Sequence, residues 1–315
     1  MAGELTSVNA AQAIAKYVAG KALPALFGNL VMGNLVNRDF EPTLAQAGDT
    51  VNISIPPVMT ANNLQEAGTV VQQNPSLGNA QIVLNVHAEA TFAIPDAMKV
   101  LVVPDLLKTY MDPAIIAIAT RVETDLLGCY TLFTANTAVG GASAMDESRL
   151  DSAEKALFDA YVPAGAPRYA VVASSAYAAL RQIPRFTEFQ MTGPSGQPSP
   201  MLTGELAAQA NVAQTRGGGT LKGMQIYRSQ FPAVTTSTTY HNLVFARDAL
   251  GLVIRRLPQP IPGTGAIAEY AEFGNFGVRV VMSYAAGTLA QQFTVDCLYG
   301  VNVIRNNFGV DMQGL

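Results

Sequence analysis

The run IVLNVHAEATFAI at residues 82–94 is the strongest structural signal in the chain, because apolar side chains recur there at every second position. His87, Glu89 and Thr91 fall between them. A period of two predicts a half-buried β-strand, about 40 Å long at about 3.3 Å per residue. The run VNISI at residues 51–55 has the same period and predicts a partner strand.

The segment between these two strands is much longer than the usual hairpin connection of two to five residues. Pro56-Pro57, Asn62-Asn63 and Asn74-Pro75 punctuate it, and these pairs are typical of turns. We therefore predict a long two-stranded projection with a polar loop at its tip. Since an isolated hairpin is only marginally stable in water, its apolar face should lie against a neighbouring subunit.

Helical periodicity follows the second strand. The pair Asp112-Pro113 is typical of a helix start, and apolar residues continue at helical spacing to Phe133. This pattern predicts a helix over residues 113–133 and a short helical turn at 104–110, which is either separate from the helix or joined to it. A second amphipathic helix is predicted over residues 146–161, with acidic residues at its start.

The remaining chain mixes short helices and strands and indicates the α+β class. Residues 184–223 are rich in Pro, Gly and Ser, which predicts long loops. The predicted helices are 5–19, 174–182 and 203–210, and the predicted strands are 169–173, 243–246, 251–254, 278–284 and 293–304.

Charged residues are scarce in this chain. They make up 13% of its 315 residues, against about 25% in an ordinary globular domain. A compact monomer of 33.2 kDa would expose roughly 12,500 Å² of surface. The charged residues are few for a surface of that size, so they would do little to prevent association with other molecules. We therefore expect much of the surface to be buried against copies of the same chain.

Composition also argues against several functions. A net charge of -4 disfavours a protein that grips nucleic acid through clustered Lys and Arg. The N-terminus lacks the order of a signal peptide, and the apolar runs are far shorter than the ~20 residues of a membrane span, so no membrane partner is expected. Cys129 and Cys297 are far apart, which indicates neither a disulfide framework nor a zinc site.

No combination of residues predicts a catalytic, cofactor-binding or metal site. The glycine-rich segment 217–223 lacks the Lys-Ser/Thr order of a phosphate-binding loop, so a hairpin or loop is the better interpretation. His87 and His241 are the only histidines, and His87 falls on the polar side of its strand. The carboxylates between Asp146 and Asp159 are most simply a helix start and a solvated face, although a hydrolase using them is a remote alternative.

The order of these segments resembles the tailed-phage major capsid proteins of the Hong Kong 97-like fold. Three strings carry the resemblance: NLVNRDFE at residues 34–41 followed by AGDTVNI at 47–53, FARDALGL at 245–252, and LYGVNVIR at 298–305 followed by FGV at 308–310. The last of these is most similar to coat proteins of short-tailed phages, whose best-known member carries an inserted domain. That insertion is absent here, because only a few Thr and Ser residues separate Pro232 from Asn242.

The resemblance implies a division of the chain. Residues 1–46 would form an N-arm, 47–94 an extended E-loop with its lead-in strands, 95–163 a peripheral domain with a spine helix, 164–262 an axial domain, and 263–315 further peripheral strands and the C-terminal return. Some family members crosslink their subunits through a lysine in the extended loop. No Lys lies between Lys21 and Lys99, so non-covalent contacts should hold this shell. The expected assembly contacts are Arg38, Phe40, Asn62, Asn63, Glu66 and Phe92.

The implied function is a major capsid protein that forms the hexamers and pentamers of an icosahedral phage head around double-stranded DNA. Its other implied partners are portal and scaffolding proteins and possibly decoration proteins, its location is the virion after assembly in the host cytoplasm, and it needs no cofactor. The alternative within the same fold is the shell of an encapsulin-type bacterial compartment.

Overall fold

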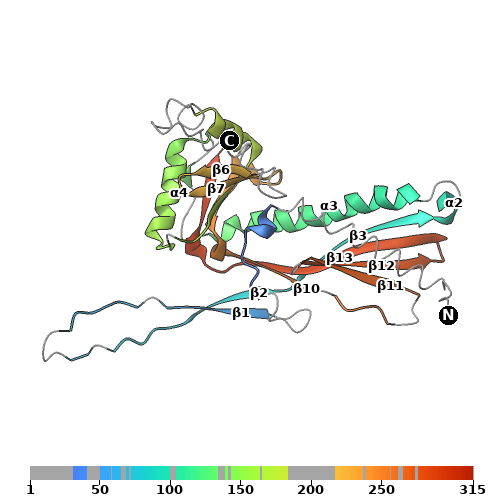
Figure 1. Ribbon diagram of the computed structural model, residues 1–315, viewed down its shortest axis with the longest axis horizontal. Coiled ribbons are helices and arrows are strands. Elements are labelled where there is room, and N and C mark those ends of the chain that lie inside the picture. Colours follow the sequence, from blue (N-terminus) through green and yellow to red (C-terminus); the bar gives the residue numbers. More distant parts are fainter. Residues whose placement is uncertain are drawn as a thin grey trace, which may run out of the picture.

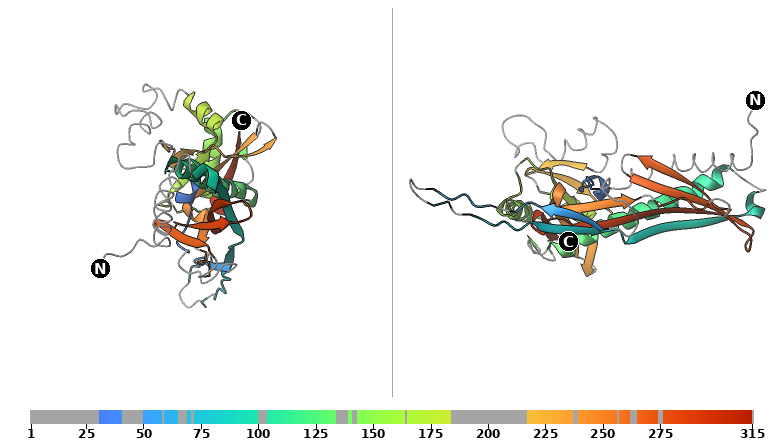
Figure 2. Two further views of the ribbon diagram at one scale, coloured as in Figure 1. Left: turned by 90° about the vertical axis from the view of Figure 1, so that its right-hand side faces the viewer. Right: turned by 90° about the horizontal axis from the view of Figure 1, so that it is seen from below.

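The chain was analysed as a computed structural model. It describes residues 31–40, 50–57, 59–64, 69–70, 72–99, 104–133, 139–140, 143–163, 165–183, 217–236, 239–255, 257–261, 265–273 and 276–314. The helices predicted at residues 5–19 and 203–210 lie outside these ranges. The described elements form two sheets, a long helix and a projecting hairpin, arranged along one elongated axis (Figures 1 and 2).

An antiparallel sheet makes up one end of the molecule (Figure 1). Its strands are β3 (Val86–Pro95), β10 (Leu250–Arg255), β11 (Ile267–Phe273), β12 (Phe276–Ala285) and β13 (Ala290–Val303). The central strand β13 pairs with β3 along one edge, and with β12 and then β10 along the other. β3 is therefore the outer strand on one side of β13, and β10 and β11 are outer strands on the other side.

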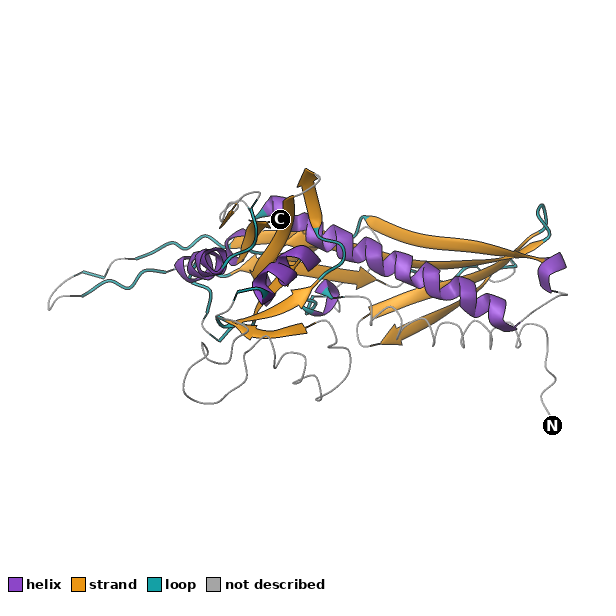
Figure 3. Ribbon diagram, turned by 90° about the horizontal axis from the view of Figure 1, so that it is seen from above, coloured by secondary structure: helices purple, strands orange, loops and turns teal. Residues whose placement is uncertain are grey.

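Helix α3 (Pro104–Gly128) lies along one face of this sheet (Figures 1 and 3). The predicted turn at 104–110 and the predicted helix join into one, so the helix begins at Pro104 and Pro113 lies inside it. A proline costs the helix one hydrogen bond but keeps a helical φ. Burial outweighs that cost, since Ile115, Ala119 and Val122 are almost completely buried against the sheet. The helix ends in the 3-10 turn η3 (Cys129–Leu132).

A second, seven-stranded sheet stands beside the helix's C-terminal end (Figure 1). Its order is β4-β14-β9-β5-β7-β6, with β8 also paired to β9. The strands are β4 (Val139–Gly140), β5 (Arg168–Val172), β6 (Gly217–Leu221), β7 (Met224–Arg228), β8 (Ala233–Thr236), β9 (Thr239–Ala246) and β14 (Gly309–Gly314).

Two helices belong to this second unit, α4 (Glu147–Asp159) and α5 (Ser174–Arg181). The predicted start of α4 is confirmed, because the Asp146 carboxylate accepts a hydrogen bond of 3.0 Å from the Arg149 N–H. Such a cap satisfies one of the free N–H groups at a helix start. The hairpin predicted for residues 217–223 is also confirmed, with Lys222 and Gly223 at positive φ in the turn between β6 and β7.

The projection consists of β1 (Thr50–Ile55) and β2 (Gly78–Val83), paired antiparallel from Thr50↔Val83 to Ile55↔Gly78. It extends away from both sheets (Figures 1 and 2). The prediction that residues 82–94 form one strand of this projection is wrong. The chain leaves the hairpin at Leu84 and enters the five-stranded sheet at Val86, so β2 and β3 belong to different sheets.

Short 3-10 turns connect the two sheets. η6 (Arg247–Ala249) joins β9 to β10, and η7 (Asn306–Phe308) joins β13 to β14. The Ala249 carbonyl accepts a hydrogen bond of 2.8 Å from the Ile304 N–H, which ties the two turns together. A third turn, η1 (Met32–Asn34), packs against α3. One continuous apolar core runs through both sheets and α3.

Candidate assembly surfaces

The base of the hairpin has an apolar core of its own. It is separate from the main core and joins the two hairpin strands to β10 and β13. Phe40 packs against this cluster from the N-terminal side. The buried members are Val51, Ile53, Ile82, Leu84, Val253, Leu298 and Ile304. The base is therefore anchored within the subunit, and the rest of the projection is held only through it.

The far part of the projection exposes large apolar side chains. Met59, Leu64, Val70 and Leu77 are 61%, 62%, 73% and 67% exposed. Glu66 is the only charged residue between Asp49 and His87. Several exposed large apolar side chains on a segment with a single charge are typical of a surface that another molecule covers.

The residues expected at assembly contacts fall in different places. Asn62 and Asn63 are exposed on the same part of the projection as Leu64. Arg38 is half-buried, and Phe40 contacts the hairpin's own base. Glu66 lies outside the described residues. Asn62 and Asn63 therefore lie beside the exposed Leu64 on the projection, whereas Arg38 and Phe40 lie at the body of the subunit.

Phe92 lies elsewhere than expected. It belongs to β3 in the five-stranded sheet, not to the projection. Its ring stacks on Phe293 at a centroid distance of 5.3 Å and on Tyr110 of α3 at 5.9 Å. These contacts are within one subunit, so Phe92 is a packing residue between sheet and helix in the isolated chain.

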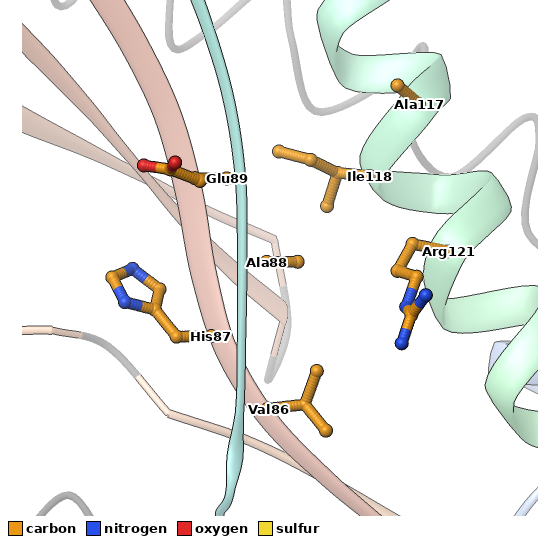
Figure 4. A pocket seen from close by; sticks show the side chains of 7 residues that line it. All are labelled: Val86, His87, Ala88, Glu89, Ala117, Ile118 and Arg121. Atoms are coloured by element: carbon orange, nitrogen blue, oxygen red, sulfur yellow. The ribbon is translucent and has the colours of Figure 1, made fainter.

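A cavity of about 370 Å³ opens between β3 and α3 (Figure 4). Val86, Ala88 and Ile118 project into the space between the strand and the helix. Arg121 points into the same space and pairs with Asp125 at 3.3 Å. The lining residues are Val86, His87, Ala88, Glu89, Ala117, Ile118 and Arg121. Of these, Val86, Ala88, Ala117 and Ile118 are apolar, and the side chains of His87 and Glu89 project from the strand on the side away from the helix.

The acidic residues of α4 are engaged in local interactions. Lys222 Nζ pairs with Glu147 Oε1 at 3.0 Å and also with the Asp151 carboxylate. Burial lowers the pKa of Lys222, but the hydrogen bonds that Lys222 donates to Asp151 and Glu147 outweigh it and raise that pKa overall. Asp159 pairs with Lys155 at 3.1 Å on the exposed face of the helix. The two pairs of Lys222 fasten α4 to the β6-β7 turn, and the Lys155–Asp159 pair lies within the helix.

Both histidines are bonded to aspartates across neighbouring strands. His87 Nε2 lies 3.0 Å from Asp296 Oδ2, and Asp296 is also held by Arg279 Nε at 3.0 Å. His241 Nδ1 lies 2.7 Å from Asp311 Oδ2 in the interior of the seven-stranded sheet. Burial raises the pKa of Asp311, although its hydrogen bond with His241 opposes this. Neither pair is accompanied by a nucleophile positioned for attack among the described contacts.

The two cysteines are buried and unlinked. Burial, reinforced by Asp125, raises the pKa of the Cys129 thiol to about 12, and burial likewise raises that of Cys297 to about 12. Within the described residues, no three His, Cys, Asp or Glu side chains gather where they could hold a metal ion. Of the described helices, none has the length and apolar character needed to cross a membrane.

The arrangement of long helix, two sheets and projecting hairpin is the Hong Kong 97-like fold of phage capsid proteins, as the sequence resemblance implied. No protein-family model and no curated protein matches the chain in sequence. Solved structures match it over most of its length.

Three solved structures illustrate the match. A chain of Mycobacterium phage Che8 has a TM-score of 0.63 and 20% identity, covering 90% of each chain. The capsid of Cyanophage P-SCSP1u has a TM-score of 0.59 and 13% identity, covering 91% of this chain and 88% of the other. The capsid of Ralstonia phage GP4 has a TM-score of 0.55 and 11% identity, covering 89% and 86%. At these identities the likeness establishes the fold.

Proposed function

We propose that this chain is a major capsid protein whose copies assemble into the hexamers and pentamers of an icosahedral phage head. The observation that carries the proposal is the projecting hairpin. It exposes Met59, Leu64, Val70 and Leu77 on a segment with a single charge, in a chain that has the capsid fold. The hairpin of each copy covers part of the neighbouring copy, and this removes those side chains from water.

Assembly of this kind depends on many modest interfaces. Each copy contributes a hairpin and receives another, so the contacts add across a closed shell. The N-terminal residues 1–46 make further contacts as an arm. No lysine between residues 22 and 98 is available for an isopeptide bond, and the buried, high-pKa thiols of Cys129 and Cys297 do not form disulfides. The shell is held by non-covalent contacts.

In this proposal the shell encloses double-stranded DNA without sequence-specific binding. The net charge of -4 fits, because a strongly basic lining would hold the genome too tightly to be packaged and released. Portal and scaffolding proteins, and decoration proteins where present, are the other partners, and the shell is built in the host cytoplasm. The chain performs no catalysis, in keeping with the local ion pairs that occupy the α4 carboxylates.

The test is the assembly state of the purified full-length chain. Sedimentation and negative-stain microscopy should reveal closed shells or capsomers, whereas a stable monomer at high concentration would overturn the proposal. An encapsulin-type compartment would share the fold. Neighbouring genes distinguish the two, since a phage head requires terminase, portal and scaffolding genes and a compartment requires a cargo enzyme.

A further inference from the structure

The base of the hairpin crosses the five-stranded sheet over two glycines. Gly251 lies in β10 and Gly300 in β13, and the register pairs Gly251 with Asn302 and Val253 with Gly300. The two glycines are therefore diagonal neighbours on one face of the sheet. The end of β2, at Ile82 and Val83, rests on that face.

The fit at Gly300 is set by backbone atoms. A Cβ added there would overlap the Val83 carbonyl oxygen and would lie 2.8 Å from the Val83 carbonyl carbon and 3.2 Å from Ile82 Cγ2. A backbone carbonyl cannot rotate away as a side chain can. Any side chain at position 300 must therefore push the end of β2 off the sheet.

The fit at Gly251 is set by side chains. A Cβ added there would overlap Ile82 Cδ1 and would lie 3.0 Å from Ile304 Cδ1. Ile82 is completely buried in the hairpin's base cluster, so it has little room to move.

A hydrogen bond fixes the hairpin's position along the same surface. Asn302 Nδ2 donates to the Gln81 carbonyl at 2.6 Å, and Asn302 Oδ1 accepts from the Val303 N–H at 2.8 Å. The side chain is thus held at both ends, and it links the hairpin to β13.

We propose that Gly251, Gly300 and Asn302 are positioning residues that set the angle at which the hairpin leaves the body of the subunit. Gly251 and Gly300 lie in the strings FARDALGL and LYGVNVIR, in which they face the hairpin's base. The assembly consequence rests on the proposed function. Leu64 lies up to about 40 Å from Val51 along an extended strand, so a tilt of about 10° at the base moves it roughly 7 Å. A shift of that size takes the exposed apolar side chains away from their contact on the neighbouring copy.

The test measures the hairpin's direction separately from assembly. Spin labels on Ser76→Cys, in the projection, and Lys155→Cys, on exposed α4, report the distance between hairpin and body by pulsed EPR of unassembled full-length subunits. The native cysteines are buried with raised pKa values, so they stay unlabelled. Gly300→Ala and Gly251→Ala should each shift the mean distance by several ångströms. Gly287→Ala, whose added methyl meets nothing within 4 Å, should leave it unchanged.

Two further variants keep the test decisive if an alanine variant folds poorly. Ile82→Val removes the Cδ1 atom that the Gly251→Ala methyl meets, so the double variant should recover the wild-type distance. Asn302→Ala introduces no clash but removes the hydrogen bond to the Gln81 carbonyl, so it should broaden the distribution of distances between hairpin and body.

Whether the same variants form shells tests the proposed function independently of the positioning role. Shifted distances together with lost shells support both. Shifted distances with normal shells support the positioning role and overturn hairpin docking as the basis of assembly. Unchanged distances in Gly300→Ala and Gly251→Ala would overturn the positioning role itself.

Discussion

The carboxylate of Glu123, on α3, accepts hydrogen bonds from the backbone N–H of Met32 at 3.1 and 3.2 Å. The Val31 N–H donates to the same carboxylate at 3.2 Å. Glu123 is 1% exposed, so this charge is held in the interior by the first turn of the N-terminal segment. Hydrogen bonds to a charged group are stronger than neutral ones, and leaving their partners unsatisfied in the interior is costly.

We expect Glu123→Ala to lower the free energy of unfolding of the subunit by about 2–4 kcal/mol, because two backbone N–H groups lose their acceptor. Glu123→Gln keeps one oxygen at the same place and should lose about half as much. Urea unfolding of unassembled subunits measures both values. The half-buried Glu154→Ala on α4 is the control, and equal losses at the two glutamates would contradict a role for Glu123 in holding the segment.

The exposed part of the hairpin should matter for assembly and little for folding. Leu64 is 62% exposed in the subunit, so Leu64→Asp should change the free energy of unfolding by no more than about 0.5 kcal/mol. In the shell the same carboxylate would be buried without a partner, and shells should fail to form. Sedimentation of the purified variant measures this. Leu64→Met keeps the side chain apolar and should assemble normally; normal shells from Leu64→Asp would show that Leu64 is not in a contact.

A charge at Phe92 should instead reduce the stability of the subunit itself. Phe92→Asp places a carboxylate between the rings of Phe293 and Tyr110, so the subunit itself should lose about 3 kcal/mol or more of stability. Ala93→Asp, on the exposed side of the same strand, should be nearly neutral. Thermal unfolding of the two variants makes the comparison. A stable Phe92→Asp subunit that failed only in assembly would instead assign Phe92 to an intersubunit contact.

The thiols should be inert in the native chain. Burial raises the pKa of both Cys129 and Cys297 to about 12, so almost no thiolate is present at pH 8. A thiol reagent such as DTNB should label neither residue in native protein and both in denaturant. Reducing agents should not dissociate the shells, and rapid native labelling at either position would contradict the burial.

Much of the fold could be predicted from periodicity. The alternation at residues 51–55 predicted β1 and that at 82–94 predicted β3, and helical spacing up to Phe133 predicted most of α3; the second hairpin strand, Gly78–Val83, was assigned to the wrong residues. The sequence pattern does not indicate where the chain passes from the hairpin to the five-stranded sheet. Ile82 and Leu84 are buried in the hairpin base, and Val86 and Ala88 face the main core, so the period of two continues across the break.

Other features depend on contacts between distant residues. Asp112-Pro113 is a typical helix start, yet α3 runs through this pair from Pro104 to Gly128. β14 was not predicted, because its aspartate, Asp311, is buried through its pairing with His241 on β9.

The candidate surface was partly predictable. Asn62 and Asn63 were selected from the loop for their turn chemistry, whereas the exposed apolar residues beside them were missed. Met59, Leu64 and Val70 were the available signal, since isolated apolar residues in a polar loop have no core to enter. The glycines beneath the hairpin are recognisable only in three dimensions, because their closest contacts come from Ile82 and Val83, more than 150 positions away.

The most direct test of the central claim is a cryo-EM map of the particles formed by the purified full-length chain. We expect a closed icosahedral shell in which the hairpin of each copy lies on a neighbouring copy, with Met59, Leu64 and Val70 buried in that contact. A shell whose hairpins project into solvent, or a chain that remains a monodisperse monomer at high concentration, would contradict it.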